Sequence, residues 1–166
     1  NRLGFDEQVP TRTYVYNDRL SGERSVGPIR LVLIRVKAER LAFTEQVKDT
    51  AGRTAIYPTR ARALFDAVYD WARFNSLPRG YERIRRELSA KRVKAEDLVE
   101  ITLRLGDMGT MRRIGFLLEK EGARNDLLKK LEKRLSPTSS FIPWIPTLPK
   151  RGTINRRWGL VDNRSA

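Results

Sequence analysis

The side chains in this sequence that could do chemistry are chiefly arginines and lysines, and they gather in two places. Between residues 79 and 94 seven cations accompany only two carboxylates, Glu82 and Glu87. A second, smaller group lies in the last seventeen residues. Cations at this density neutralise phosphate groups. The sequence therefore predicts nucleic-acid binding through Arg79, Arg83, Arg86, Lys91, Arg92, Arg156 and Arg157.

A solvated helix face accounts for the cations near residue 85 equally well, because surface helices commonly carry arginine and lysine. A third basic stretch differs from the first two. It alternates with Glu132 on a segment striped with leucines, and we interpret it as an ordinary solvated face: Lys129, Lys130, Lys133 and Arg134.

Two residue types that many enzymes require are absent. The sequence has no cysteine and no histidine, which excludes disulfides, zinc ribbons, cysteine nucleophiles and Ser-His-Asp triads. We expect no cofactor, no metal site and no enzymatic activity, although a Mg²⁺ site made only of carboxylates stays possible in principle.

Two further patterns have weaker chemical meaning. Asp66 and Asp70 lie one helical turn apart, but each has an arginine nearby, and we interpret them as a charge-balanced, solvated face. The glycines of segment 106–109 resemble part of a phosphate-binding loop, yet no lysine of the Walker type follows them. A turn between helices, with glycines at positive φ, is the favoured interpretation.

Length and charge set the class of protein. The chain has 166 residues, 34 Lys plus Arg against 20 Asp plus Glu, and a formal net charge of +14. Its apolar content of 40% fits a soluble globular protein. No segment approaches the ~20 apolar residues of a membrane span, and no secretory leader is recognisable. We expect a cytoplasmic protein. Because residue 1 is Asn, we also expect that an upstream segment is missing.

The elements that must position these cations change along the chain. Residues 1–57 favour strands, with residues 29–36 as a central strand covered on both faces and residues 49–52 as the link of a hairpin. After Pro58 the apolar period becomes about 3.6, which predicts five helices up to residue 135. In the second helix Tyr81, Ile84 and Leu88 face inward, so the arginines at 79, 83 and 86 should point outward together.

The last part, residues 136–166, contains four prolines within fourteen positions, which rules out a continuous helix or central strand there. We expect its aromatic residues to pack against the helices and residues 157–161 to form a last strand, at an edge. We interpret Gly115 as a contact with another backbone and Trp158 as a core residue beside a small neighbour, Gly159.

The predicted fold is thus α+β: a small, mainly antiparallel sheet, then a five-helix bundle, with a Pro-rich C-terminal tail packing back on it. We expect a single domain over residues 1–166, with a β-rich part at 1–57, a helical part at 58–135 and a closing tail at 136–166.

Four motifs in this order resemble the C-terminal domain of the AbiEi antitoxin family of type IV (abortive infection) toxin–antitoxin systems. Residues 3–10 are similar to the family's Gly-Leu-Thr-x-Gln-x-Pro entry, and residues 56–66 to its proline leading into a helix with Leu-x-Asp. Residues 112–119 (RRIGFLLE) are similar to Arg-Arg-Leu-Gly-Tyr-Leu-Leu-Glu, and residues 157–163 (RWGLVDN) to Arg-Trp-x-Leu-x-x-Asn. In one departure from the family, Thr59 replaces the usual glutamate.

The resemblance implies an antitoxin active in phage defence, which represses transcription of its own operon and neutralises a nucleotidyltransferase-like toxin without a stable complex. It implies no catalytic residue. The family's N-terminal winged helix, which contacts operator DNA, would lie upstream of residue 1. This segment would then support the binding of duplex DNA.

Two alternatives remain. One is a basic RNA-binding or ribosome-associated protein, for which Tyr14, Tyr16 and Trp144 are the candidate stacking residues. The other is a Mg²⁺-dependent enzyme of the toxin's type that uses Asp66.

Overall fold

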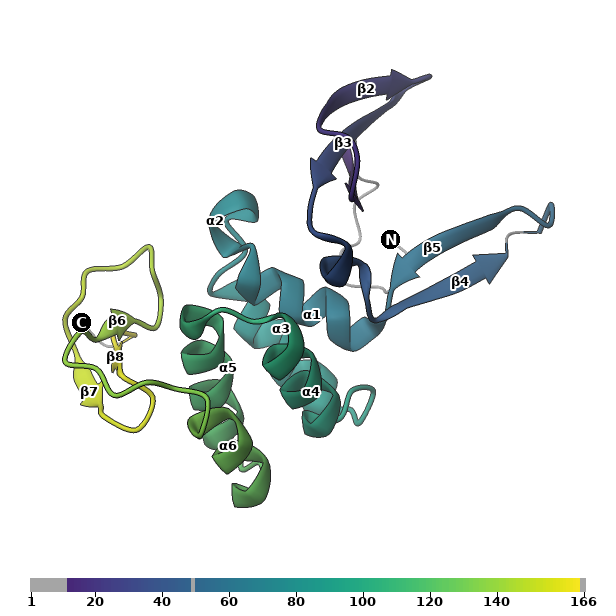
Figure 1. Cartoon of the computed structure of the whole chain (residues 1–166). Helices are drawn as coiled ribbons and strands as arrows, with labels where there is room; N and C mark the ends of the chain where they lie inside the picture. The colour runs from purple at the N-terminus through teal and green to yellow at the C-terminus, as the bar shows by residue number, and fades with distance from the viewer. Residues whose placement is uncertain (1–11, 49, 165–166) are drawn as a thin grey trace. The chain divides into compact units, whose positions relative to one another are not determined.

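The computed structural model describes residues 12–48 and 50–164, and it divides the chain into two compact units, Asn1–Pro58 and Thr59–Ala166 (Figure 1). The boundary between the units lies one residue from the point where the sequence pattern changes from strand to helix. Each unit is described by itself below.

The first unit begins with a three-stranded sheet. Its strands are β1 (Arg12–Asn17), β2 (Gly22–Val26) and β3 (Ile29–Arg35), in the order β1-β3-β2. The prediction of a central strand at residues 29–36 is confirmed, but its cover on both faces is wrong, since Ile34 is the one buried residue of β3. β2 pairs with β3 antiparallel. β1 pairs with β3 parallel, with a register that runs from Arg12 opposite Arg30 to Asn17 opposite Arg35.

A separate hairpin follows the short 3₁₀ helix η1 (Ala38–Leu41). Strands β4 (Thr44–Lys48) and β5 (Thr54–Pro58) pair antiparallel, which confirms the predicted hairpin; residue 49 of its link lies outside the described residues. These two strands form a sheet of their own instead of joining the first three.

The second unit contains six α-helices in its described residues. They are α1 (Arg60–Tyr69), α2 (Trp71–Phe74), α3 (Arg79–Ser89), α4 (Ala95–Leu105), α5 (Met108–Lys120) and α6 (Asn125–Glu132). The Thr59 hydroxyl accepts a bond from the Arg62 N–H and begins α1, and the Asp107 carboxylate caps α5 in the same way. The first expected helix is interrupted at Asp70, which separates α1 from α2.

The helices bury the stripes that the sequence predicts, with differences at their ends. Leu64, Phe65 and Val68 of α1 are at most 1% exposed. Trp71 is half-buried and Ala72 is exposed, so the stripe expected to continue through them ends with α1.

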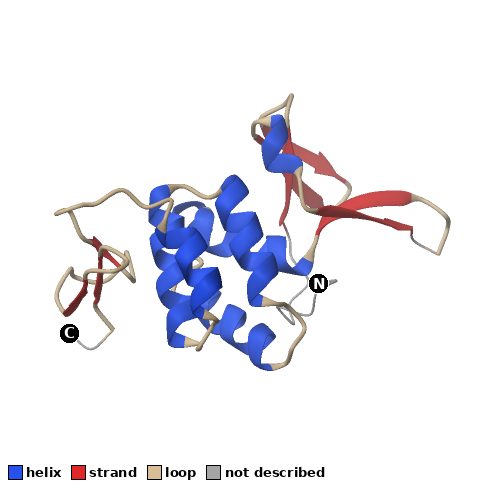
Figure 2. Cartoon of the chain, turned by 60° about the horizontal axis from the view of Figure 1, so that its bottom comes forward, coloured by secondary structure: helices blue, strands red, loops and turns tan. Residues whose placement is uncertain are grey.

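The tail forms a third small sheet beside the helices (Figures 1 and 2). Its strands are β6 (Ile142–Pro143), β7 (Thr153–Asn155) and β8 (Leu160–Asp162), in the order β6-β8-β7. The expected last strand is confirmed as β8, but its expected place at an edge is wrong, because β8 lies in the centre of the sheet.

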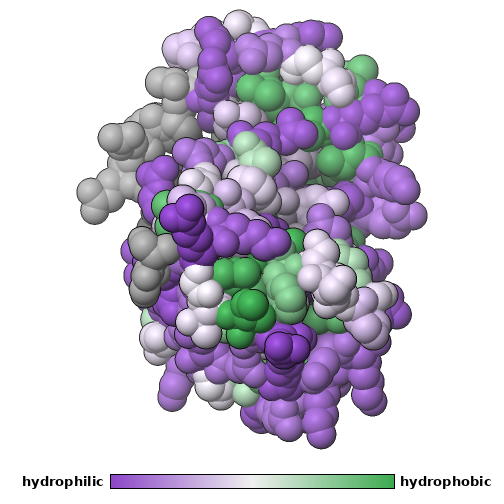
Figure 3. Space-filling view, turned by 90° about the vertical axis from the view of Figure 1, so that its left-hand side faces the viewer, coloured by the Kyte–Doolittle hydropathy of each residue, from purple (hydrophilic) through white to green (hydrophobic). Residues whose placement is uncertain are grey.

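Trp144 and Trp158 of the tail are fully buried. The Tyr81 hydroxyl of α3 donates a hydrogen bond of 2.7 Å to the Trp144 carbonyl. Figure 3 looks onto this side of the molecule, where most of the visible surface is hydrophilic around limited apolar areas. In the described part of this unit the exposed large apolar side chains are Met108, Leu148 and Ile154.

No helix within the described ranges is long and apolar enough to cross a membrane.

Candidate nucleic-acid interface

The predicted cations of α3 do not form one uniform outward face. Tyr81 and Ile84 are buried as expected, while Leu88 is half-buried. Arg79 and Arg86 are exposed, whereas Arg83 is half-buried. Helix α3 therefore presents fewer cations to solvent than its sequence suggests.

A buried carboxylate, which sequence reasoning missed, organises part of this cluster. The Glu87 side chain is 2% exposed and accepts bonds from Arg92 at 2.7 Å and from Arg60 at 2.8 Å. Arg86 lies 3.9 Å from the same carboxylate. The hydrogen bond from Arg92, together with those from Arg60, holds the pKa of Glu87 below its ordinary value against the opposing effect of burial. Arg92 thus neutralises a core charge and has less capacity for an external phosphate.

The end of α3 explains how Arg92 reaches Glu87. Lys91 adopts a left-handed conformation with φ of 54°, and the Arg92 N–H donates to the Glu87 carbonyl at 3.0 Å. This is the backbone pattern of a Schellman ending, in which the chain folds back over the last turn. The Lys91 side chain remains exposed and makes no ion pair with a described carboxylate.

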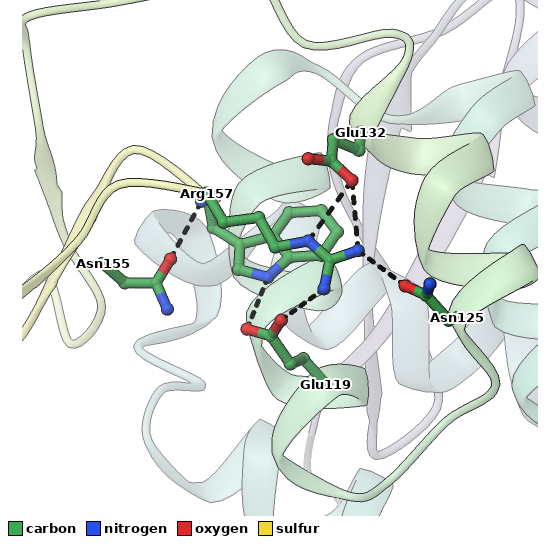
Figure 4. A network of polar contacts seen from close by, with 6 residues as sticks. Glu119, Asn125, Glu132, Asn155 and Arg157 are labelled. Atoms are coloured by element: carbon green, nitrogen blue, oxygen red, sulfur yellow. Dashed lines mark hydrogen bonds and ion pairs between the residues drawn. The ribbon is translucent and has the colours of Figure 1, made fainter.

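The two adjacent arginines of the tail have different surroundings. The Arg157 guanidinium donates to Glu119 at 2.6 Å and to Glu132 and Asn125 at 3.1 Å (Figure 4). Although burial opposes its charge, the bonds to Glu119 and Glu132 hold the pKa of Arg157 above its ordinary value. Arg157 therefore connects the tail to α5 and α6. Arg156 is exposed, and within residues 12–48 and 50–164 it forms no ion pair.

Sequence reasoning also missed a basic groove between α4 and α6. It is shallow, with a volume of about 520 Å³. Its lining consists of Glu100, Leu103, Arg104, Lys130, Lys133 and Arg134. Four cations therefore surround one carboxylate, on α4, on α6 and on the two residues that follow α6, and these two helices pack together.

The groove cations at the end of α6 remain available for a ligand. Lys130, Lys133 and Arg134 are exposed, and none pairs with a carboxylate of the described chain. They are three and four residues apart in the sequence, with Lys130 in the last turn of α6, Lys133 at its C-cap and Arg134 directly after it. The same spacing was visible in the sequence, but the facing arginine of α4 comes from a segment 26 positions or more away.

The carboxylates expected to be solvated are not. Arg62 is 2% exposed and Asp66 is 9% exposed, and they form a buried ion pair of 2.9 Å. The expected charge balance of Asp66 is thus present, but its interpretation as part of a solvated face is wrong, and Asp70 is half-buried. Among the described residues no group of three acidic side chains could hold a metal ion.

The glycine segment begins with the expected connection between α4 and α5, at Gly106 and Asp107, but Gly109 already lies in the first turn of α5. Gly106 has φ of −78°, so the turn does not depend on positive φ there. An added β-carbon at Gly106 would lie 2.5 Å from the Thr102 carbonyl oxygen. Lack of space requires glycine at this position.

One candidate for base stacking is removed by the structure. Trp144 is fully buried, with Tyr81 stacked on its ring at a centroid distance of 4.7 Å. Tyr14 is 44% exposed and Tyr16 is half-buried.

Comparisons with known proteins give no relative: no family model, no curated protein and no solved structure matches this chain.

Proposed function

We propose that this chain is the non-enzymatic part of an AbiEi-like antitoxin and transcriptional autoregulator, and that it supports the binding of duplex DNA in the cytoplasm. In this proposal α1 and α2 count as one element of a five-helix bundle that the Pro-rich tail closes. The observation that carries the DNA role is the groove between α4 and α6, with four cations around one carboxylate.

The residues of the two best-matching motifs support the resemblance. Gly115 and Glu119 belong to the motif on α5, and Arg157 and Trp158 belong to the closing motif. Glu119 accepts bonds from both, at 2.6 Å from Arg157 and at 2.8 Å from the Trp158 indole N–H. Residues of the two motifs thus bond to each other, which supports treating the two motifs as parts of one structural feature.

The chemistry of the groove fits a phosphate backbone better than bases. Its polar groups are mostly ammonium and guanidinium groups, which bind phosphates without reading sequence. Lys130 lies in the last turn of α6, and Lys133 and Arg134 follow at the end of the helix. Such a groove would add affinity to a neighbouring domain that recognises the operator.

Fluorescence anisotropy with a labelled DNA duplex tests this role. We expect binding at ~50 mM salt that weakens as salt rises. Reversing three groove charges together, with Lys130→Glu, Lys133→Glu and Arg134→Glu, should abolish most of it. A matched control reverses three exposed cations outside the groove, Lys129→Glu, Lys150→Glu and Arg151→Glu.

The outcome separates three possibilities. Loss only in the groove variant supports the proposal, whereas equal loss in both variants means that net charge alone attracts DNA. Absence of binding at low salt overturns the DNA role for this chain. Competition with a structured RNA tests the RNA-binding alternative, which wins if RNA displaces the duplex at lower concentration.

The antitoxic role rests on the resemblance and needs a cellular test. Cells that express a nucleotidyltransferase-like toxin of such a system should grow when this chain is co-expressed. Toxicity that persists with the folded chain present would contradict that part of the proposal.

A further inference from the structure

A second cavity, which the DNA proposal does not use, lies where the tail meets α5 and the end of α6. Its volume is about 150 Å³. It is lined by Arg112, Glu132, Leu135, Ser136, Pro137, Thr138, Arg156, Arg157, Trp158 and Gly159. This volume exceeds the roughly 10–15 Å³ that one water needs and is smaller than the ~300 Å³ of ordinary ligand pockets. Its occupant is therefore a small group or the end of a larger molecule.

The charge around this cavity favours an anion. Three arginines and one carboxylate line it. Arg157 is compensated by Glu132 and by Glu119. Arg112 and Arg156 pair with no carboxylate among the residues that the structure describes. Two positive charges in the lining thus have no nearby carboxylate of their own.

The position of Arg112 is set by its neighbours. Its guanidinium donates to the Ser140 carbonyl at 3.3 Å. On the other side it lies against Gly159, where an added β-carbon would stand 3.4 Å from Nε and Cζ of Arg112 and 3.0 Å from Cγ2 of Thr138. The glycine, with φ of 60°, leaves room for both side chains at one wall of the cavity.

The remaining polar groups are suited to an oxyanion. The loop after α6 is ordered by the Ser140 N–H, which donates to the Thr138 hydroxyl at 3.0 Å. Ser136 and Thr138 also line the cavity, but the Thr138 hydroxyl donates its proton to the Ser140 carbonyl at 3.3 Å, so Ser136 is the hydroxyl residue considered for an oxyanion. Guanidinium groups match the geometry of phosphate through paired hydrogen bonds.

We propose that this cavity binds a dianionic phosphate monoester group, with Arg112 and Arg156 as its ligands. The proposal is independent of DNA binding in the groove. The group could come from a small soluble phosphomonoester or from the 5′-phosphate at the end of a nucleic-acid strand, since the chemistry recognised is the same.

Titration of the full chain, followed by ¹H–¹⁵N NMR of the arginine Nε–H groups, tests this site. Inorganic phosphate and adenosine 5′-monophosphate should each cause saturable shifts in two arginine signals. Arg156→Gln should weaken this binding at least about tenfold, because it removes hydrogen bonds to a charged group. Arg112→Gln should have the same effect, and it also removes the corresponding signal.

The control is Arg151→Gln, which removes an exposed arginine of the same tail that does not line the cavity. Its affinity should equal that of the parent chain. A short oligonucleotide with a 5′-phosphate should bind more tightly than the same strand ending in a hydroxyl. Comparing the phosphorylated strand with the mononucleotide then separates the two sources. Preference for the phosphorylated strand over the mononucleotide identifies a strand end, and the reverse order identifies a soluble ligand.

Two results would overturn the proposal. One is the absence of saturable shifts with every phosphate compound. The other is binding that Arg156→Gln and Arg151→Gln weaken equally, which would show nonspecific attraction by the tail.

Discussion

The indole ring of Trp158 occupies the space that a side chain at Gly115 would fill. An added β-carbon at Gly115 would overlap with Cζ3, Cε3 and Cη2 of this ring. Trp158 is fully buried, and its N–H donates to Glu119, one turn further along α5, at 2.8 Å. The tail is thus fitted to one face of α5 by shape and by a hydrogen bond together.

This contact predicts that Gly115→Ala destabilises the protein. In an open helix position the change would add up to about 1 kcal/mol of stability, but overpacking against Trp158 should cost about 1–3 kcal/mol. Urea unfolding followed by tryptophan fluorescence measures it, because Trp71, Trp144 and Trp158 all lie in the second unit. Stabilisation by this substitution would contradict the contact.

A double-mutant cycle assigns the cost to its cause. In a Trp158→Leu background the smaller side chain leaves room, so Gly115→Ala should cost less there than in the parent chain. Equal costs in the two backgrounds would mean that the overlap lies elsewhere.

The buried carboxylate of α3 predicts a particular dependence on pH. The pKa of Glu87 lies below its ordinary value of 4.5, chiefly through the hydrogen bond from Arg92. Glu87 therefore stabilises the fold at neutral pH, and this contribution is lost as pH falls below 4.5 through the pKa of the folded state. Glu87→Gln should lower the unfolding free energy at pH 7 by about 2 kcal/mol, and by progressively less as the pH falls below 4.5.

Glu82→Gln is the matched control for Glu87, since Glu82 is an exposed residue of the same helix. Its unfolding free energy should follow the parent chain at every pH. If the two variants show the same pH profile, the ion pairs of Glu87 with Arg60 and Arg92 do not stabilise the fold, which would contradict the prediction.

Arg156 and Arg157 are adjacent in the tail and carry the same charge, so replacing each in turn compares a paired arginine with an exposed one. Arg157→Ala removes the guanidinium that pairs with Glu119 and Glu132, leaving Glu119 with its bond from Trp158, and should cost about 2 kcal/mol of stability. Arg156→Ala removes an exposed side chain and should change stability by less than about 0.5 kcal/mol. Thermal unfolding of both variants decides this; equal melting temperatures would contradict the structural role of Arg157.

Periodicity in the sequence predicted which faces turn inward. It identified residues 29–36 as a central strand and residues 49–52 as the link of a hairpin. It also identified the buried residues of α1 and of the first turns of α3. It also predicted Trp158 as a core residue beside a small neighbour. The partner of Gly115 was wrong in kind, since an aromatic ring takes the place of the expected backbone.

The site residues were harder to predict because charges find partners across long separations. Arg60 lies 27 positions before Glu87, and Arg157 lies 38 positions after Glu119. Period and spacing indicate that a cation is on a polar face, but they do not show which carboxylate faces it. The same limit hid the groove, because Arg104 and Lys130 meet only when α4 packs against α6.

The central claim is that the groove between α4 and α6 holds DNA phosphates. It is tested most directly by the dependence of duplex affinity on salt. Each phosphate contact contributes about −0.9 to the slope of log affinity against log salt. The variant Lys130→Glu, Lys133→Glu, Arg134→Glu should therefore show a slope smaller in magnitude by at least ~2.7 than the parent chain. An unchanged slope in this variant would contradict the claim.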